Sequence, residues 1–358
     1  MKRLLATAAA VTLATTTGAF GAGSAGGVTV VAPHLNNPRG VWVAKDGSIY
    51  VAEAGKAGPA SVAKDTFLGF SSAIVKVAGG PAARVVRNLI SAGGRDGTFT
   101  TGADGVAVDP SGAMYVAMTG APCAFKAPAA AKAQIGQLLR VRGGKTESVA
   151  DLQSLECKNN YDRTDKNPNP YAVLALGGDH EIVVDAGGNT VFDVRGKKAR
   201  LLAVIPKLVN GAQAVPTSIA LGPDGAYYVG AFGGEGKGKP KRNLSRVYRI
   251  VPGRKPTVYQ SGFNAITGLA FAKDGTMYVT EFSTDPTNQN NFKGDVVAVS
   301  KSGARKHLGV GSLFYPAGAA IGADGALYVS NWSILPGTAP KTGPFKGKNG
   351  ELVRLAFS

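Results

Sequence analysis

The chain has 358 residues, of which 44% are hydrophobic, and a formal net charge of +17 at pH 7. After the first residues, no apolar run approaches the roughly 20 residues that a membrane-spanning helix needs, so the sequence excludes a multi-span membrane protein. Fifty glycines and 20 prolines separate many short apolar runs, which indicates an all-β protein. The positive charge favours anionic partners, among which we expect cell-wall polymers, glycans or small molecules rather than a specific nucleic acid. Plain solubility is the alternative explanation of the charge.

The first residues have the pattern of a secretory signal peptide. Lys2 and Arg3 form a basic start, residues 4–13 form a short apolar run, and small residues follow. An uncleaved membrane anchor is the weaker alternative, because the run is short and rich in Ala and Thr. We therefore expect a signal peptide over residues 1–27 and a secreted, monomeric mature protein over residues 28–358.

One phrase recurs along the mature chain: an apolar run, a tight turn such as Asp274 and Gly275, and a second apolar run. Alternating apolar residues on both sides of an Asp-Gly pair are a strong signal for a β-hairpin. Self-similarity of this kind predicts an array of stacked supersecondary units. The six copies span residues 39–53, 103–118, 171–185, 218–231, 266–281 and 317–331.

Each of the first five hairpins is followed by a second pair of strands, so a complete unit has four short strands, named A to D in chain order. After the sixth hairpin only one strand remains, at residues 351–357, whereas the chain begins with a lone strand at residues 28–35. We therefore predict an all-β, six-bladed β-propeller of four-stranded antiparallel blades, closed by the N-terminal strand joining blade six.

The strand order separates the loops onto two faces. The short A–B and C–D turns lie on one face, and the B–C loops and D–A crossovers, which hold every long insertion, lie on the other, which we call the long-loop face. Cys123 and Cys157 both fall on the long-loop face, and an oxidising compartment favours a disulfide between them. Closing that loop would stabilise the fold by roughly 3–4 kcal/mol.

Equivalent positions in the six copies form rings at the long-loop face. Oxygen ligands that converge on a propeller axis would suit Ca²⁺ or another divalent cation, so Glu53, Asp185, Glu281 and Asn331 are candidate metal ligands. The alternative is that acidic residues end these strands because the face is wet, or because they pair with nearby Arg and Lys. The residues that end strand B are Glu53, Met118, Asp185, Ala231, Glu281 and Asn331.

The residues that open strand A form a second ring. Arg39 and Asp104 lie in adjacent blades, and we expect them to pair across the mouth of the channel. Tyr171, together with Phe232 and Trp332 one place past strand B, is a candidate for the wall of a ligand pocket, with packing between blades as the alternative. The complete ring is Arg39, Asp104, Tyr171, Thr217, Thr267 and Ala317.

Basic residues in the fourth B–C loop are the remaining binding candidates. A basic surface on one face would dock an acidic polymer, and flexible solvated loops are the alternative interpretation. The candidates in this loop are Lys237, Lys239, Lys241 and Arg242.

The histidines argue against His-based catalysis. His34 falls in the closing strand, His180 in the third A–B turn and His307 beside strand D of blade five, so none maps to the long-loop face. A general base or a Ser/Cys–His nucleophile therefore lacks its parts, although paired carboxylates would still allow hydrolysis.

The repeat phrase, of the form G-[LV]-A-x-x-x-[DS]-G-x-[LIM]-Y-V, resembles NHL-type six-bladed propellers. With the leader, the NPRG opening at residues 37–40 and the SNW phrase at residues 330–332, the chain is similar to the ScyD/ScyE family of exported bacterial propellers. That resemblance implies the propeller fold but no defined catalytic motif. The phrase also resembles streptogramin lyases, whose functional His pattern has no counterpart here, and gluconolactonase-like propellers, which ligate a metal at the channel mouth.

These patterns favour a secreted, non-catalytic binding or scaffold protein that recognises an anionic polymer or a small ligand at its long-loop face. The alternative is a divalent-metal-dependent hydrolase or lyase, lactonase-like or streptogramin-lyase-like, with its site at the channel mouth. A propeller fold hosts too many functions to decide between them.

Overall fold

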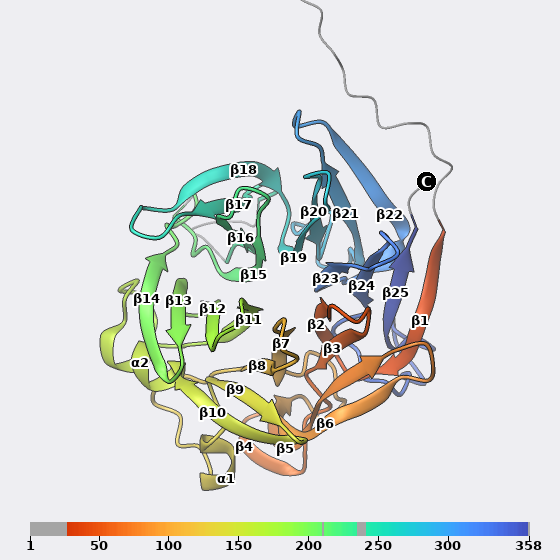
Figure 1. The fold of residues 1–358 in the computed structure, drawn as a ribbon. Coiled ribbons are helices and arrows are strands. Elements are labelled where there is room, and N and C mark those ends of the chain that lie inside the picture. The colour runs from red at the N-terminus through yellow and green to blue at the C-terminus, as the bar shows by residue number, and fades with distance from the viewer. Residues whose placement is uncertain (1–26, 210, 235–240, 357–358) are drawn as a thin grey trace, which may run out of the picture.

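The computed structural model describes residues 27–209, 211–234 and 241–356, and its strands form six blades around a central channel (Figure 1). The predicted six-bladed β-propeller is confirmed. Residues 1–26 of the predicted signal peptide lie outside the described residues. In the part of the chain that is described, no helix is long and apolar enough to cross a membrane.

Blades 2 to 5 each contain four consecutive antiparallel strands, ordered from the channel outward. Blade 2 contains β7 (Ala103–Val108), β8 (Met114–Met118), β9 (Gln137–Arg142) and β10 (Lys145–Asp151). Blade 3 contains β11 (Pro170–Ala175), β12 (His180–Asp185), β13 (Thr190–Arg195) and β14 (Lys198–Val204). Blade 4 contains β15 (Pro216–Leu221), β16 (Tyr227–Ala231), β17 (Ser245–Ile250) and β18 (Thr257–Phe263). Blade 5 contains β19 (Ile266–Phe271), β20 (Met277–Glu281), β21 (Lys293–Val299) and β22 (Arg305–Phe314).

Blade 1 departs from the four-strand expectation. Its insertion after strand B folds back as a short extra strand, β4, which pairs with the first residues of the long strand C, β5. Strand β6 pairs with the opposite edge of β5, from Phe67 to Lys76. The result is a five-stranded sheet on the long-loop side of this blade. Its strands are β2 (Pro38–Val43), β3 (Ile49–Glu53), β4 (Ala60–Ala63), β5 (Thr66–Val77) and β6 (Ala83–Gly93).

Blade 6 joins the two ends of the chain, as predicted. Strand β1 pairs antiparallel with β25, so that Val28 lies opposite Leu355 and Ala32 opposite Leu352. Alternation along β1 buries Ala32 and leaves Thr29 exposed, so one face of the strand packs on the neighbouring blade. The blade contains β23 (Ala319–Ile321), β24 (Leu327–Asn331), β25 (Gly350–Leu355) and β1 (Val28–Leu35).

The hydrophobic core consists of layers between adjacent blades rather than one central cluster, because the axis is occupied by the channel. Strand A of one blade approaches the next closely where glycine lies: a Cβ on Gly105 would come within 2.8 Å of the Tyr171 carbonyl oxygen. Trp42 packs against three of the inter-blade layers and therefore occupies part of the channel.

In the described part of the chain, two short helices interrupt the loops on the long-loop face: α1 (Ala129–Lys132) and α2 (Leu152–Asn159). The carboxylate of Asp151 caps α2 by accepting from the Ser154 N–H at 2.9 Å. Cys123 and Cys157 form the predicted disulfide, with a Cα–Cα separation of 5.6 Å, and it ties α2 to the B–C loop of blade 2.

Ring closure can be tested on β1 itself. Ala32→Asp places an unpaired charge at a position that is 1% exposed, so we expect it to lower the free energy of unfolding by about 3 kcal/mol or more. Thr29→Asp on the exposed side of the same strand is the control, with an expected change within about 0.5 kcal/mol. Urea unfolding followed by tryptophan fluorescence measures both. Equal effects of the two variants would contradict the role of β1 as a packed blade strand.

Candidate active site at the channel mouth

A β-bulge opens strand A in five of the blades and sets the direction of one side chain. The register of strands A and B shifts between Ala103 and Gly105, leaving Asp104 as the extra residue, and the same shift recurs in the other four blades. A bulge leaves its extra residue unpaired and re-aims that side chain. The re-aimed residues are Arg39, Asp104, Tyr171, Thr217 and Thr267, so the predicted second ring lies at the long-loop end of the channel.

Arg39 and Asp104 form the expected pair across the mouth. The Nε of Arg39 lies 3.8 Å from Oδ1 of Asp104, and its Nη2 donates to the Thr100 carbonyl at 3.0 Å. Asp104 is only 2% exposed, and its Oδ2 has no hydrogen-bond partner. Burial raises the pKa of Asp104 to about 7, although the Arg39 charge acts in the opposite direction. The carboxyl group is therefore balanced between its two protonation states near neutral pH.

The other members of the ring have different tasks. Tyr171 lines the cavity beside this pair, and burial raises the pKa of its hydroxyl, so it stays protonated and can donate a hydrogen bond. The Thr217 hydroxyl donates to the Ile266 carbonyl at 2.6 Å, and the Thr267 hydroxyl donates to the Pro316 carbonyl at 2.9 Å. These two threonines therefore link adjacent blades, and the chemically open half of the mouth is the Arg39–Asp104–Tyr171 side.

The channel contains a cavity of 260 Å³ lined by strand A of all six blades. Its walls are mainly apolar, but three lining residues hold buried polar atoms without a partner: Asp104 Oδ2, Trp42 Nε1 and Ser218 Oγ. The sequence reasoning missed Trp42 and Ser218. Their positions, three residues after Arg39 and one residue after Thr217 in a predicted strand A, were the available signal, since that strand lines the axis of a propeller.

The strand-B ring does not converge on the channel. Each of its four candidate metal ligands accepts a backbone N–H from the segment leading into strand A of its own blade: Glu53 from Asn36 at 2.7 Å, Asp185 from Asn169 at 2.7 Å, Glu281 from Asn264 at 2.8 Å and Asn331 from Phe314 at 2.7 Å. The repeated acidic or amide residue thus satisfies a donor of each crossover that would otherwise be buried unpaired.

Further contacts distinguish the surroundings of these four candidate ligands. Arg84 binds both oxygens of Glu53, at 2.6 and 2.7 Å, and the Asn331 amide donates to Glu351 at 2.9 Å. Among the described residues, no three His, Cys, Asp or Glu side chains are grouped so as to hold a metal ion. The structure therefore gives each of the four candidate metal ligands its own surroundings instead of bringing them together.

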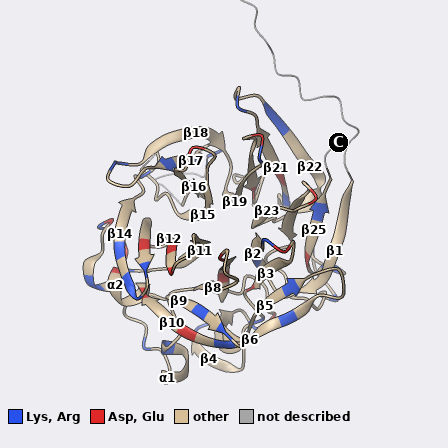
Figure 2. Ribbon diagram, viewed as in Figure 1, with Lys and Arg blue, Asp and Glu red and all other residues tan. Residues whose placement is uncertain are grey.

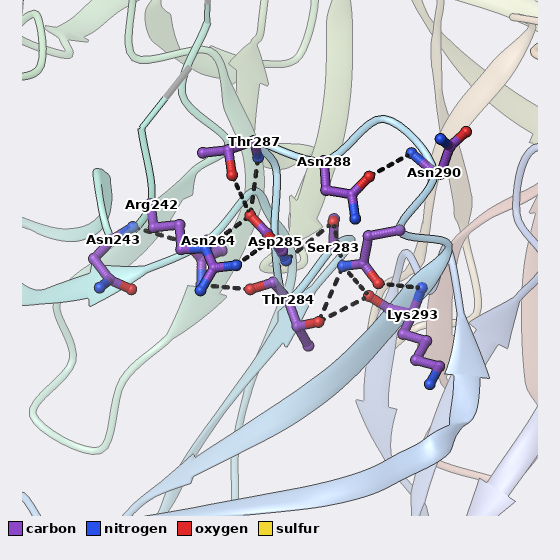
Figure 3. Close-up of polar contacts among 11 residues, drawn as sticks. Arg242, Asn243, Asn264, Ser283, Thr284, Asp285, Thr287, Asn288, Asn290 and Lys293 are labelled. Carbon is purple, nitrogen blue, oxygen red and sulfur yellow. Dashed lines mark hydrogen bonds and ion pairs between the residues drawn. The ribbon is translucent and has the colours of Figure 1, made fainter. Parts of the chain in front are cut away.

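The basic candidates fall partly outside the described residues, which include neither Lys237 nor Lys239. Lys241 is exposed. Arg242 binds the Asp285 carboxylate through Nε and Nη2, and the close-up shows it turned toward that residue (Figure 3). Arg242 is thus already paired with an acid of blade 5. Lys and Arg are spread along outer strands such as β6, β14 and β22 instead of gathering at the mouth (Figure 2).

The aromatic candidates pack among other rings beside the mouth. Trp332 stacks on Phe314 at a centroid distance of 4.5 Å, and Phe232 meets Phe282 edge-on at 5.8 Å. Neither Phe232 nor Trp332 is among the residues that line the cavity. Their arrangement agrees with the alternative of blade-to-blade packing.

The histidine prediction was wrong for His34. Its Nδ1 lies 3.1 Å from the carbonyl oxygen of Gly337 in the sixth B–C loop, so it reaches the long-loop face at the outer edge of blade 6. The other two are placed as expected: His180 begins β12 at the short-turn end, and His307 in β22 contacts Asp295 at 2.6 Å. No histidine lines the cavity.

The sequence profile of a family described as the "SMP-30/Gluconolactonase/LRE-like region" matches residues 149–339, more than half of the chain. The matched region includes Tyr171, Thr217 and Thr267 but not Arg39 or Asp104. No curated protein sequence matches the chain significantly.

Several solved structures share the fold. A gluconolactonase from Xanthomonas campestris aligns with a TM-score of 0.53 and 9% identity, over 92% of this chain and 89% of that chain. The calcium-binding protein regucalcin from Agrobacterium tumefaciens aligns with a TM-score of 0.53 and 13% identity, over 94% of both chains. A streptogramin B lyase aligns with a TM-score of 0.51 and 12% identity, over 92% of this chain and 97% of that chain. Identities this low show the propeller fold alone.

The structural role of the strand-B ring can be tested at Glu281. Burial, with a contribution from the charge of Asp295, raises the pKa of Glu281 to about 7. The folded protein therefore holds a proton that the unfolded chain releases above about pH 4.5, so this group's contribution to stability falls as the pH rises toward 7. Glu281→Gln keeps an acceptor for Asn264 without that cost, and we expect it to be more stable than the parent by about 1–3 kcal/mol at pH 8 and equal near pH 5.

Glu281→Ala is the matched variant, because it leaves the Asn264 N–H unpaired. We expect it to be less stable than Glu281→Gln by about 1–3 kcal/mol at both pH values, because both variants lack the carboxyl group and only Gln keeps the acceptor. Urea unfolding at pH 5 and pH 8 measures all three proteins. Equal stabilities of Glu281→Gln and Glu281→Ala would mean that the side chain at position 281 does not act as a hydrogen-bond acceptor.

Proposed function

This chain belongs to the SMP-30/gluconolactonase/LRE-like family, and on that premise we propose that it is a hydrolase of lactones or related cyclic esters, acting at the mouth of the central channel. The family name and the likeness to a gluconolactonase support a lactonase-like reaction rather than a purely scaffolding role.

The observation that carries this proposal is the buried carboxyl group of Asp104. It faces the cavity, its Oδ2 is free, and its pKa of about 7 suits a group that must both accept and return a proton at neutral pH. Burial in an otherwise apolar channel with one guanidinium nearby is an environment that stability alone does not require.

The neighbouring residues supply the remaining elements of ester hydrolysis. Asp104 accepts a proton from water while the water oxygen bonds to the carbonyl carbon of the substrate. The Arg39 Nε–H, which has no hydrogen-bond partner, donates to the carbonyl oxygen as that oxygen gains negative charge. When the ring C–O bond breaks, the proton returns from Asp104 to the leaving alkoxide and a hydroxy acid is formed. Tyr171, as a neutral donor, orients the substrate.

The mouth does not fit the divalent cation that gluconolactonase-like propellers hold there. Hard cations take several oxygen ligands, usually with more than one carboxylate. This ring offers one carboxylate, and it already faces a guanidinium. The remaining members are a tyrosine, two threonines and an alanine, so the proposed steps use the protein's own side chains.

The cavity limits the size of the substrate. A volume of 260 Å³ with apolar walls and polar groups near one end takes a compact single-ring molecule with one face lying against the strands. An anionic polymer would have to bind outside the channel, where Arg242 is already engaged by Asp285. The binding-protein interpretation therefore has less support than the hydrolase.

Cellular location and subgroup belong to the same proposal. The disulfide between Cys123 and Cys157 supports folding in an oxidising compartment, in keeping with secretion. The phrases NPRG and SNW support a place among ScyD/ScyE-like propellers.

Activity can be measured by proton release from gluconolactone, γ-butyrolactone and δ-valerolactone. We expect kcat/KM to rise with pH through about 7, because Asp104 must be deprotonated to accept the proton. Asp104→Asn should lower kcat by about 10²–10⁴-fold, since it removes the base. Tyr171→Phe should raise KM more than it lowers kcat.

Asp274→Asn is the control, because Asp274 is exposed in an A–B turn at the other end of the channel. It should leave the rate unchanged, and thermal melts should show that every variant is folded. The proposal fails if the unmodified protein hydrolyses none of the three lactones, or if Asp104→Asn keeps the full rate.

A further inference from the structure

A second group of buried carboxylates lies away from the channel, where blades 2 and 3 meet on the long-loop face. One side is α2, which carries Glu156 and is held by the disulfide of Cys157 to Cys123. The other side is the turn between β12 and β13, which begins at Asp185 and ends at Thr190. Glu156, Asp185 and Thr190 are each 0% exposed.

Several oxygen atoms of these side chains have no hydrogen-bond partner. Both carboxylate oxygens of Glu156, Oδ2 of Asp185 and Oγ1 of Thr190 are buried in this state. Asp185 and Thr190 are directly opposite in the β12–β13 ladder, so their side chains lie on the same face. Asn160, the C-cap residue that follows α2 one turn after Glu156, also has a buried and unpartnered Oδ1.

Local backbone geometry brings Glu156 against the turn. A Cβ added to Gly188 would lie 2.9 Å from Oε2 of Glu156, so only glycine leaves room for the carboxylate there. The N–H groups of Gly187 and Gly188 donate to Oδ1 of Asp185, at 3.0 and 2.9 Å, which leaves Oδ2 as the free oxygen. The Glu156 carboxylate thus lies against the same turn whose glycine N–H groups bind Asp185.

No cationic side chain compensates these charges. In the described residues, neither Glu156 nor Asp185 forms an ion pair, whereas the buried acids Glu53 and Asp104 each face an arginine. Two buried carboxylates without a counter-charge are costly, and a bound cation would remove that cost.

The surroundings of Glu156 add negative charge instead of offsetting it. Asp162 lies near enough to act on Glu156, and its own oxygens already accept from Thr164 and Asn189. Burial, together with the charges of Asp185 and Asp162, raises the pKa of Glu156 to about 7, and the Tyr161 backbone N–H offsets only part of this effect.

We propose that Glu156, Asp185 and Thr190 bind one Ca²⁺ ion, which joins α2 to blade 3. The free atoms are all oxygens, which favours a hard cation over zinc or copper, and Glu156 has both oxygens free for bidentate binding. The proposed ligands are the two carboxylates, the Thr190 hydroxyl and neutral oxygens such as Oδ1 of Asn160. This composition agrees with the finding that no three His, Cys, Asp or Glu of the described residues hold a metal together.

The site has a structural role and is separate from the proposed catalytic mouth. A Ca²⁺ ion there would link the segment that follows blade 2 to the turn of blade 3, where two glycines and a disulfide already fix the backbone. Its loss should affect thermal stability rather than the pH dependence of hydrolysis. Failure of one proposal is therefore distinguishable from failure of the other.

The test uses the full chain after dialysis against EGTA. Addition of 1 mM CaCl₂ should raise Tm by about 5 °C, because an ion that binds only the folded protein stabilises it. Tb³⁺ reports binding directly, because excitation of the nearby Tyr161 should sensitise its emission. Burial, and then the neighbouring charge of Glu156, raise the pKa of the Tyr161 hydroxyl, which places this ring close to Glu156. Tyr161→Phe should weaken that emission and leave the Ca²⁺-dependent rise in Tm unchanged.

Glu156→Gln is the decisive variant, because it keeps the shape and removes one charge. We expect it to lose the Ca²⁺-dependent rise while its Tm in EGTA equals or exceeds that of the parent, which separates loss of a ligand from misfolding. Glu181→Gln is the matched control: Glu181 is a buried glutamate at the other end of β12, beside Tyr115 and Arg140, and its variant should keep the rise.

Three results would overturn the proposal. The first is an unchanged Tm on adding Ca²⁺ together with no sensitised Tb³⁺ emission. The second is a Ca²⁺-dependent rise that survives in Glu156→Gln. The third is a stability that responds only to pH, which would mean that the two carboxyl groups share a proton instead of a cation.

Discussion

The pairing of β1 with β25 is the interaction on which the rest of the molecule depends, because it turns a row of sheets into a ring. A propeller channel exists only when the last blade packs on the first. Here Gly318 of blade 6 donates its N–H to the Arg39 carbonyl at 3.2 Å, and the Ser330 hydroxyl donates to the same oxygen at 2.5 Å. Closure thereby fixes the backbone of the residue whose guanidinium faces Asp104.

A closed ring also determines the electrostatics of its buried acids. The Asp104 carboxyl group is desolvated because strands of several blades surround it, and one guanidinium only partly offsets the effect on its pKa. Glu53 faces the same problem and is compensated by two short contacts with Arg84. Glu156 and Asp185 have no cationic partner, and for that reason we propose a bound cation between α2 and blade 3. All of these acids are buried, and they differ in whether a cationic side chain lies beside them.

The repeat uses equivalent positions for different purposes. At the start of strand A, one bulge geometry presents a charged pair in blades 1 and 2 and threonines that link blades in blades 4 and 5. At the end of strand B, the recurring oxygen accepts a backbone N–H of the crossover, and we assign a further role only to Asp185, where the turn leaves its second oxygen free.

The sequence by itself determined the six units, the strand order, the closing strand, the disulfide and the pairing of Arg39 with Asp104. These follow from local turn chemistry and from a repeat that makes positions equivalent, so counting along the chain is enough. Only the tertiary structure decided that the strand-B oxygens accept N–H groups of the crossovers between blades, that Arg242 is bound by Asp285, and that Glu156 lies against the turn of blade 3. Those facts depend on which donors and charges approach from other blades and loops. Contacts between residues far apart in the chain leave no periodic pattern in the sequence.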